Sequence, residues 1–215
     1  MEGYLVVPWD VLALGAESTI FHGYWSNKEV ILKVRPCKSY LITPIDRMLR
    51  ISRTVRESRM LTFARTLGVP TPSVYWIDVQ TSSILMDFIR GESLKNLVES
   101  LTNEKLAQLC KTFGYLLAEL HKGDTIHGDP TTSNVILDEF DKMWLIDFGL
   151  SERNATIEMK GTDLHLVNRA IETTHWKHQE IMNQSILDGY SSNYGSDSNL
   201  IIARMNAIRE RGRYH

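Results

Sequence analysis

Two polar motifs separated by short apolar segments constrain the fold of this chain more than any other feature of its sequence. The stretch HGDPTTSN spans residues 127–134, and IDFG spans residues 146–149. The apolar segments NVILD and MWLIDF flank the turn-forming stretch EFDK, and this pattern predicts a β-hairpin. The hairpin would carry the polar residues of both motifs.

The acidic and amide residues of these motifs are the types that phosphoryl transfer from ATP requires. That reaction needs Mg²⁺ held against the phosphates, a lysine that orients them and a carboxylate beside the acceptor oxygen. Asp129 can place its carboxylate near the acceptor, and Asn134, five residues later, can place an amide oxygen on the metal. Asp147 would supply a second metal ligand.

The loop between Asp129 and Asn134 has two interpretations. Thr131, Thr132 and Ser133 are small enough to let the chain pass close to a ligand, while Pro130 stiffens the start of the loop. The same composition is also typical of an ordinary surface turn. DFG alone is a weak signal as well, but the order of the two motifs and the apolar segments between them favour phosphotransfer.

A lysine and a glutamate upstream complete this set. Lys33 lies near the end of the predicted strand VILKV, where its ammonium can point toward the phosphates, and Glu57 lies in the helix predicted next. Each alone is more typical of a solvated position, but their order ahead of the two motifs favours a pair in which Glu57 holds Lys33. We predict that Asp129, Lys33 and Asn134 are catalytic and that Asn134 and Asp147 bind the metal.

Two further segments are candidates for contacts with the nucleotide. LGAES lies between the first two predicted strands, where a loop that covers a nucleotide belongs, although its single glycine makes it a weak signal for a phosphate cradle. The residues expected to bind ATP there are Gly15, Ala16 and Glu17. In ILMDFI, Met86 is expected to face the adenine pocket, and backbone groups of Asp87 and Ile89 are expected to bond the base. A buried strand edge is the alternative for that segment.

The rest of the chain divides into a strand-rich first part and a helix-rich second part. Apolar runs at 4–9, 18–25 and 29–34 predict strands, with SNK as a hairpin turn. Helical spacing from Thr43 to Leu67 predicts one or two helices, ended by GVPTP. SVYWIDV and SSILMDFI predict two more strands, and GESLKNLVE and NEKLAQLCKTFGYLLAELHKG predict helices. The amphipathic face of residues 105–121 is expected to pack in the core, with partner binding as the alternative.

Composition excludes several classes of protein. The 215 residues, 43% of them hydrophobic, can bury a core as one domain or two small lobes. The formal net charge of -2 means that any contact with nucleic acid must come from a local patch. The two cysteines form no metal-binding pattern, the start of the chain lacks the blocks of a signal peptide, and no apolar run approaches the ~20 residues needed to cross a bilayer. We expect a protein without a membrane span, cytoplasmic by default and also nuclear if its source is a eukaryote.

The residues in this order resemble the eukaryotic-type protein kinase superfamily. Finer detail resembles its small atypical branch, the PRPK or Bud-type kinase/ATPases of the KEOPS complex. The segments that carry the resemblance are GAES, KVRPCKSY, RTVRESR, HGDPTTSN, DFGLS, KGTDL, RAIETTH and the basic tail RERGRYH. The chain departs from the branch at Pro130, at 41–43 and at Trp176, where the branch usually has Leu, Arg-x-Pro and Pro.

The resemblance implies a bilobal, protein-kinase-like α+β fold. A small N-lobe of antiparallel sheet and helix would span residues 1–87, and a reduced, mostly helical C-lobe would span residues 88–215. It further implies ATP and Mg²⁺ as cofactors, and an atypical serine/threonine kinase/ATPase activity that supports threonylcarbamoyl-adenosine modification of tRNA. The implied partners are a threonylcarbamoyl-transferase subunit and a small regulatory subunit of KEOPS. Gly128 stands where phosphorylation-gated kinases have an arginine, so we expect gating by a bound partner.

The C-terminal stretch ARMNAIRERGRYH is predicted to form a helix with one apolar face and a free basic end. The resemblance suggests that this end contacts tRNA phosphates, whereas a solubilising terminus is the simpler interpretation. The candidate tRNA contacts are Arg209, Arg211 and Arg213.

Two other classes of function compete with this interpretation. A small-molecule phosphotransferase of the aminoglycoside- or choline-kinase type shares HGD, the later Asn and the later Asp, but needs an acceptor pocket of C-terminal helices, for which this chain is short. A catalytically silent scaffold would use the kinase shape only to bind partners. It would have no need to keep Lys33, Asp129, Asn134 and Asp147 together.

Overall fold

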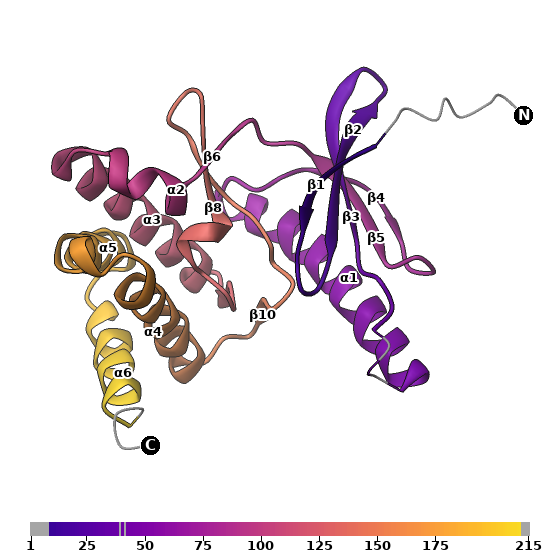
Figure 1. Cartoon of the computed structure of the whole chain (residues 1–215). Coiled ribbons are helices and arrows are strands. Elements are labelled where there is room, and N and C mark those ends of the chain that lie inside the picture. The colour runs from indigo at the N-terminus through magenta and orange to yellow at the C-terminus, as the bar shows by residue number, and fades with distance from the viewer. Residues whose placement is uncertain (1–8, 39, 41, 212–215) are drawn as a thin grey trace, which may run out of the picture.

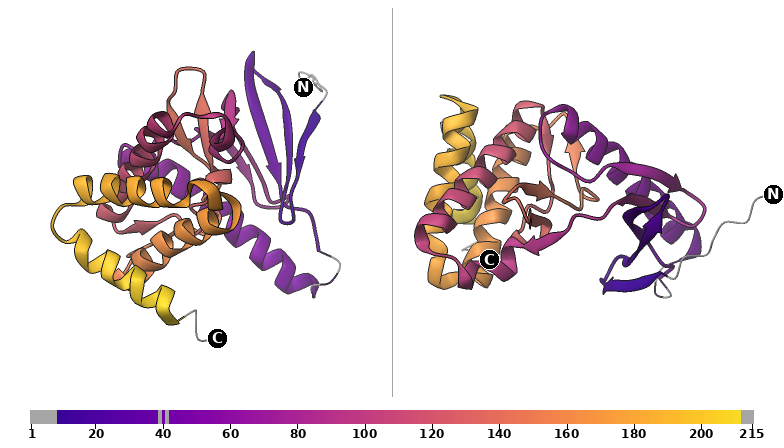
Figure 2. Two further views of the ribbon diagram at one scale, coloured as in Figure 1. Left: turned by 60° about the vertical axis from the view of Figure 1, so that its left-hand side comes forward. Right: turned by 90° about the horizontal axis from the view of Figure 1, so that it is seen from above.

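The computed structural model describes residues 9–38, 40 and 42–211, and it divides into a strand-rich and a helix-rich part (Figure 1). A five-stranded sheet and one long helix form the first part, while the second part consists mostly of helices. Seen from above, the sheet stands beside the helices rather than between them (Figure 2). The predicted α+β architecture, with a small N-terminal sheet and a mostly helical C-terminal part, is confirmed.

The N-terminal sheet is antiparallel, with the strand order β1-β2-β3-β5-β4. Its strands are β1 (Asp10–Leu14), β2 (Thr19–Trp25), β3 (Lys28–Val34), β4 (Val74–Asp78) and β5 (Ser83–Asp87). The predicted SNK hairpin forms, because Ser26 and Asn27 adopt positive φ angles of 48° and 61° that suit a two-residue turn between twisted strands. The strand predicted at 4–9 lies, apart from Trp9, outside the described residues, and the first observed strand begins at Asp10.

Helix α1 (Thr43–Thr66) is one continuous helix where the sequence allowed one or two. Pro44 fits its first turn because an N–H there has no intrahelical partner to lose. At the other end Gly68 takes a φ of 82°, and its N–H and that of Val69 donate to the carbonyls of Arg65 and Ala64. This glycine-dependent cap ends the helix where the sequence predicted. Helix α1 packs against β4 and β5.

The second part begins with short elements and continues into long helices. Its elements are β6 (Gly91–Ser93), α2 (Leu94–Leu97), η1 (Val98–Ser100), α3 (Asn103–Lys122), β7 (Thr125–Ile126), η2 (Thr132–Asn134), β8 (Val135–Asp138), β9 (Met143–Leu145), β10 (Glu152–Arg153), α4 (Ile157–Thr174), η3 (Trp176–His178), α5 (Gln179–Tyr194) and α6 (Ser198–Arg211). Strands β6, β8 and β9 form a small sheet, and β7 pairs with β10. The predicted hairpin that carries both motifs is β8–β9.

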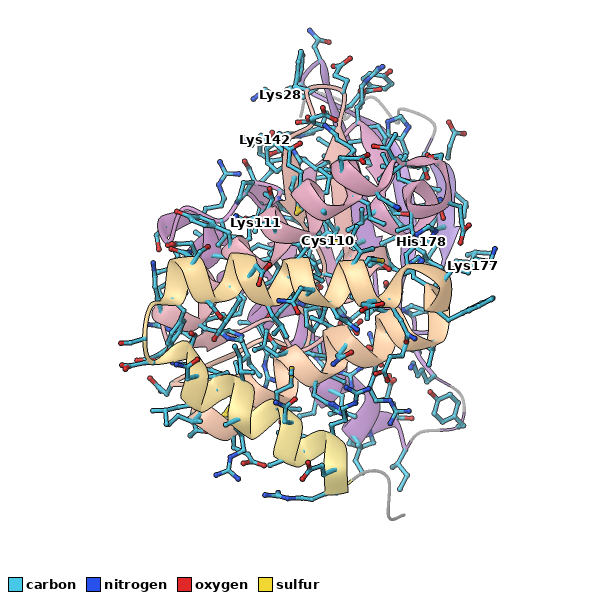
Figure 3. The ribbon with its side chains drawn as sticks, turned by 90° about the vertical axis from the view of Figure 1, so that its left-hand side faces the viewer. Lys28, Cys110, Lys111, Lys142, Lys177 and His178 are labelled. Atoms are coloured by element: carbon cyan, nitrogen blue, oxygen red, sulfur yellow. The ribbon has the colours of Figure 1, made fainter. Side chains whose placement is uncertain are left out.

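Helix α3 supplies most of the core of this part. Its apolar face buries Leu106, Phe113 and Leu117, and it packs along its length against α5, so the core interpretation of this amphipathic segment is confirmed. Figure 3 shows the side of α5 that faces away from α3. In this view α5 crosses the molecule, and α6 lies below it. Helix α4 packs against α6. Among the described residues, no helix is long and apolar enough to cross a membrane.

Candidate functional site

Two adjoining cavities lie where the sheet meets the β8–β9 hairpin. The larger, of about 520 Å³, is lined by residues of β1, β3, β5 and the hairpin, and the smaller, of about 330 Å³, by the loop after β1 and both polar motifs. The residues that line both are Gly15, Ser18, Lys33 and Asp147. A larger hollow of about 760 Å³ lies elsewhere. Its two basic residues are paired, Arg90 with Glu29 and Lys105 with Asp141, and the remaining charged residues of its lining are acidic, which does not suit phosphates.

Lys33 is the charged centre of the site. Its Nζ lies 2.8 Å from Oε1 of Glu57 and 2.8 Å from Oδ1 of Asp147, so the predicted Lys33–Glu57 pair is present. Burial lowers the pKa of Lys33, but Glu57 and Asp147 more than offset this and raise that pKa above its ordinary value. For Asp147, burial raises the pKa, but the ammonium of Lys33 outweighs it and the pKa is lowered. Both groups are therefore charged at neutral pH.

Asp129 and Asn134 are joined within their loop. The Nδ2 of Asn134 donates to the backbone carbonyl of Asp129 and to its Oδ2, both at 2.9 Å. The amide nitrogen of Asn134 is thus committed to Asp129, which leaves the amide oxygen as the end of that side chain able to bind a metal. This oxygen and the carboxylate of Asp147 are the hard ligands that Mg²⁺ prefers, and a site with only two protein ligands suits an ion that keeps water and phosphate ligands.

The hairpin brings Asn134 and Asp147 to the same end. Asn134 directly precedes β8, and its carbonyl accepts from the N–H of Ile146 at 3.0 Å, which extends the pairing past β9. Strand β9 ends at Leu145, earlier than the predicted segment MWLIDF. The reason lies at Asp147, whose φ of 60° is left-handed and breaks the extended chain. A non-glycine residue in this conformation is unusual and is often found at functional sites.

His127 and Gly128 hold the two motifs against each other. The Nδ1 of His127 accepts from the N–H of Asp129 at 3.3 Å, and its Nε2 can then donate to the carbonyl of Ile146 at 3.1 Å. Burial lowers the pKa of His127, which is consistent with a neutral ring in these two roles. Gly128 has a φ of 86°, and a Cβ there would lie 2.2 Å from the carbonyl oxygen of Leu150. Only glycine fits this position.

Asp163 on α4 is a functional residue that the sequence analysis did not assign. Its Oδ2 accepts from the N–H of His127 and its Oδ1 from the N–H of Gly128, each at 2.8 Å, and Oδ2 also lies 3.1 Å from Nε2 of His121. Asp163 therefore anchors the backbone of the HGD segment. The available signal was weak: an acid within the quoted stretch KGTDL, on a helix face that also buries the polar residues Lys160 and Asn168.

One of the loop hydroxyls has a structural partner. Thr132 is buried, and its Oγ1 lies 2.9 Å from Nε2 of His175, which follows α4. Ser133, by contrast, is exposed and lines the larger cavity. The small hydroxyl residues of this loop therefore do more than let the chain pass close to a ligand. One of them, Thr132, fixes the loop to the segment after α4.

The predicted nucleotide-covering loop borders the smaller cavity. Gly15, Ala16 and Glu17 all line it, and the N–H of Gly15 donates to the carbonyl of Ser18 at 2.9 Å to close a turn. The carboxylate of Glu17 forms an ion pair with Arg53 on α1.

The predicted adenine contacts border the larger cavity. Met86, Asp87 and Ile89 all line it, and Met86 is buried. The N–H of Asp87 donates to the carbonyl of Ser73, so its carbonyl is the backbone group that remains for a base. The carboxylate of Asp87 is bound by the N–H of Ser73 and the hydroxyl of Tyr75.

The basic tail differs from the free end that we expected. Arg209 lies 2.5 Å from Glu172, and Arg211 lies 3.5 Å from Glu158, so both form ion pairs between α6 and α4. The reason is that α4 presents acidic residues to the helix packed against it. Both arginines remain partly exposed, and Arg213 lies outside the described residues.

Comparison with known proteins places this geometry in a family. A family model described as the ABC1 atypical kinase-like domain matches residues 51–182. The chain is 42% identical over 207 residues to the KEOPS complex subunit Bud32 of Pyrococcus abyssi, which covers 93% of this chain and 94% of that protein.

Longer relatives give a second kind of match. The chain is 35% identical over 213 residues to a probable bifunctional tRNA threonylcarbamoyladenosine biosynthesis protein of Methanothermobacter thermautotrophicus, and 36% identical over 209 residues to one of Methanococcus vannielii. These matches cover 99% and 97% of this chain but only 38% and 37% of the relatives. The chain thus corresponds to a minor part of the bifunctional proteins.

Proposed function

The chain belongs to the Bud32 family of proteins with an ABC1 atypical kinase-like domain, and we propose that it is a Mg²⁺- and ATP-dependent kinase/ATPase that supports threonylcarbamoyl-adenosine modification of tRNA. Family membership supports an enzyme of the kinase/ATPase type. The acceptor of the phosphoryl group, a water or a serine or threonine hydroxyl of a protein, is the finer part of the proposal.

One observation carries the proposal: Lys33, held by Glu57 and Asp147, lies where the two cavities adjoin, and Asp129 borders the smaller one. The larger cavity has the mostly apolar lining that suits an adenine, including Met86 and Ile89. The smaller cavity has the charged lining that suits phosphates. We assign residues 1–87 and 88–215 as the two lobes that enclose the nucleotide.

In the proposed mechanism Lys33 orients the α- and β-phosphates, and Glu57 keeps its ammonium in place. Asp129 accepts the proton of the attacking water or hydroxyl as that oxygen bonds to the γ-phosphorus. The bond from this phosphorus to the bridging oxygen breaks, and ADP leaves with the electron pair. Asn134 fixes the carboxylate of Asp129 through its amide nitrogen.

Asn134 and Asp147 are the residues that we assign to Mg²⁺. When bound, the ion neutralises charge on the phosphate oxygens and aligns them. The oxygen donors described above fit that role.

The names of the relatives support a proposal about binding partners. The name of the Pyrococcus protein makes it a KEOPS subunit, and the bifunctional relatives are named for tRNA threonylcarbamoyladenosine biosynthesis. We therefore propose a threonylcarbamoyl-transferase subunit and a small regulatory subunit as partners, a cytoplasmic location, and contact of the C-terminal arginines with tRNA phosphates.

Phosphate release from ATP tests this function. The purified chain is assayed alone, then with a threonylcarbamoyl-transferase subunit and tRNA, and Asp129→Ala is the control. We expect the partner to stimulate turnover strongly and the variant to lose that turnover. Turnover that ignores partner and tRNA but rises with an added peptide or small-molecule acceptor would show a kinase with a different role.

A further inference from the structure

Arg35 is a buried cation that the proposed mechanism leaves without a role. It directly follows β3, two residues after Lys33, so alternation along the extended chain directs both side chains to one face. Lys33 and Arg35 are only 5% and 3% exposed. Both bind Glu57: Nζ of Lys33 lies 2.8 Å from Oε1, and Nη2 of Arg35 lies 2.5 Å from Oε2. One glutamate of α1 therefore holds two cations from the end of β3.

The guanidinium of Arg35 also reaches the two other segments that form the site. Its Nη1 lies 3.5 Å from Oγ1 of Thr54, one turn before Glu57 on α1. A Cβ placed on Gly149 would lie 3.1 Å from Nη2, so the segment after Asp147 passes directly beside the guanidinium. Arg35 lines the smaller cavity, and its buried Nε has no hydrogen-bond partner among the described residues. Arg35 is thus in contact with β3, α1 and the DFG segment at once.

The charges explain why a second cation is useful. Two buried cations are balanced by two carboxylates, the buried Glu57 and the partly exposed Asp147. A phosphate that drew the ammonium of Lys33 toward itself would leave Glu57 buried and without a partner if Lys33 were its only one. An unpaired buried carboxylate is strongly unfavourable. The side chain of Glu57 would therefore turn toward solvent, or water would enter the space around it. Arg35 binds the second oxygen of Glu57, and this contact does not depend on where Lys33 points.

We propose, building on the proposed function, that Arg35 is a positioning residue that holds Glu57, and with it helix α1, where Lys33 can bind phosphates. The Arg35–Glu57 contact keeps the site assembled whether or not a nucleotide is present. Arg35 acts through Glu57 and is not a catalytic residue.

Three variants test this role by steady-state ATP turnover. Arg35→Gln removes the charge, Arg35→Lys keeps it, and Arg50→Gln is the matched control. Arg50 is also largely buried and lies on α1, but its guanidinium binds Asp46 and Ser82. Among the described residues, this side chain reaches Arg35 only at the backbone carbonyl, at 3.5 Å. We expect Arg35→Gln to lower kcat about tenfold or more, because a misplaced phosphate-binding group is costly. Arg35→Lys should recover part of the loss, and Arg50→Gln should keep wild-type kcat per folded molecule.

A double-mutant cycle separates positioning through Glu57 from general loss of structure. Arg35→Gln is combined with Glu57→Gln, and kcat is normalised to the folded fraction from thermal melts. If Arg35 acts through Glu57, the double variant loses no more activity than Glu57→Gln alone. Losses that multiply, or equal losses in Arg35→Gln and Arg50→Gln, would overturn the proposal.

A structural readout keeps the test valid if the chain does not turn over ATP at all, an outcome that would defeat the proposed function alone. Amide hydrogen exchange along α1, followed by mass spectrometry without nucleotide, reports how firmly that helix is held. Arg35 contacts α1 at Thr54 and Glu57. We expect exchange around these two residues to be faster in Arg35→Gln and unchanged in Arg50→Gln. The same exchange in all variants would overturn the inference about Arg35.

Discussion

At the scale of single residues, the site depends on side chains held from more than one direction. Asn134 illustrates this, because its amide nitrogen binds both the carbonyl and the carboxylate of Asp129. Loss of the Asp129 carboxylate leaves the first of these bonds intact, so Asn134 should keep its place. Asp147 differs, since its carboxylate contacts Lys33 directly and its backbone is left-handed.

The contrast between the two aspartates gives a prediction. Asp129→Ala should abolish ATP turnover and leave the affinity for ATP within about threefold of wild type, because no assigned phosphate or metal ligand is removed. Asp147→Ala should abolish turnover and also weaken binding of Mg²⁺-ATP. Turnover by phosphate release and affinity by calorimetry at fixed Mg²⁺ check both variants. Equal turnover in both variants and in wild type would contradict the assignments.

His175 gives a prediction about pH. Its ring is buried against Thr132, and burial lowers its pKa below the ordinary 6.5, with His178 and Lys95 acting in the same direction and Glu99 opposing them. A histidine with a lowered folded pKa contributes stability above pH 6.5, and this is lost as the pH falls through the folded value, because the unfolded chain takes up the proton first.

Chemical denaturation of wild type and His175→Gln at several pH values measures this contribution. The glutamine can still hydrogen-bond Thr132 but does not titrate. We expect the wild type to lose more unfolding free energy than the variant between pH 7 and pH 5. A difference that is constant over this range would show that His175 does not remain neutral in the fold.

At the scale of secondary-structure elements, what could be predicted depended on sequence separation. The β8–β9 hairpin and the positions of Asn134 and Asp147 were predictable, because a turn and two adjacent apolar runs specify them locally. The Lys33–Glu57 pair needed only the order of a strand and a helix. The anchoring of HGD by Asp163 was not predictable from spacing, because this contact joins segments about 35 residues apart through the packing of α4.

Three other contacts could not be predicted for the same reason, because each joins segments that are distant in the sequence. The His175 contact with Thr132 has no periodicity or local motif to signal it. The pairing of Arg209 and Arg211 with acids of α4 required knowing that α4 and α6 pack together. Arg35 was within the quoted stretch KVRPCKSY, but only the position of α1 shows that it reaches Glu57.

The α3–α5 contact gives a prediction at this scale. A Cβ on Gly114 would lie 1.9 Å from the carbonyl oxygen of Ile186, and a Cβ on Gly189 would lie 1.9 Å from that of Lys111. These obstacles are backbone atoms that cannot move without separating the helices. Gly189→Ala should therefore lower the unfolding free energy by about 1–3 kcal/mol or more, although alanine favours helix over glycine by about 1 kcal/mol.

Gly161→Ala on α4 is the comparison. The nearest obstacle to a Cβ there is the side chain of Arg204, at 2.8 Å, which is flexible and can move. Urea unfolding of both variants should show a much smaller loss for Gly161→Ala than for Gly189→Ala. Similar losses would mean that α3 and α5 can separate slightly at little cost.

At the scale of the whole molecule, the near-neutral net charge of -2 makes the distribution of arginines decisive for contact with nucleic acid. Glu158 on α4 faces two arginines of α6, with Nε of Arg204 at 3.1 Å and Nη1 of Arg211 at 3.5 Å. All three side chains are well exposed, so these pairs contribute little to stability. Pairing with Glu158 does, however, neutralise positive charge of the arginines, and the proposed tRNA contact needs that charge.

Opposite changes at this end of the molecule give the last prediction. Deletion of residues 211–215 removes Arg211 and Arg213 and should weaken tRNA binding while the fold stays intact. Each lost phosphate contact flattens the dependence of log K on log salt by about 0.7–0.9, so the slope should decrease by about 1–2. Glu158→Gln frees Arg204 and Arg211 and should strengthen binding without moving the melting temperature appreciably. Filter binding to tRNA across a salt series measures both. If the tail contacts tRNA, the two variants must move affinity in opposite directions. Unchanged affinity in the truncated chain would show that residues 211–215 do not contact tRNA.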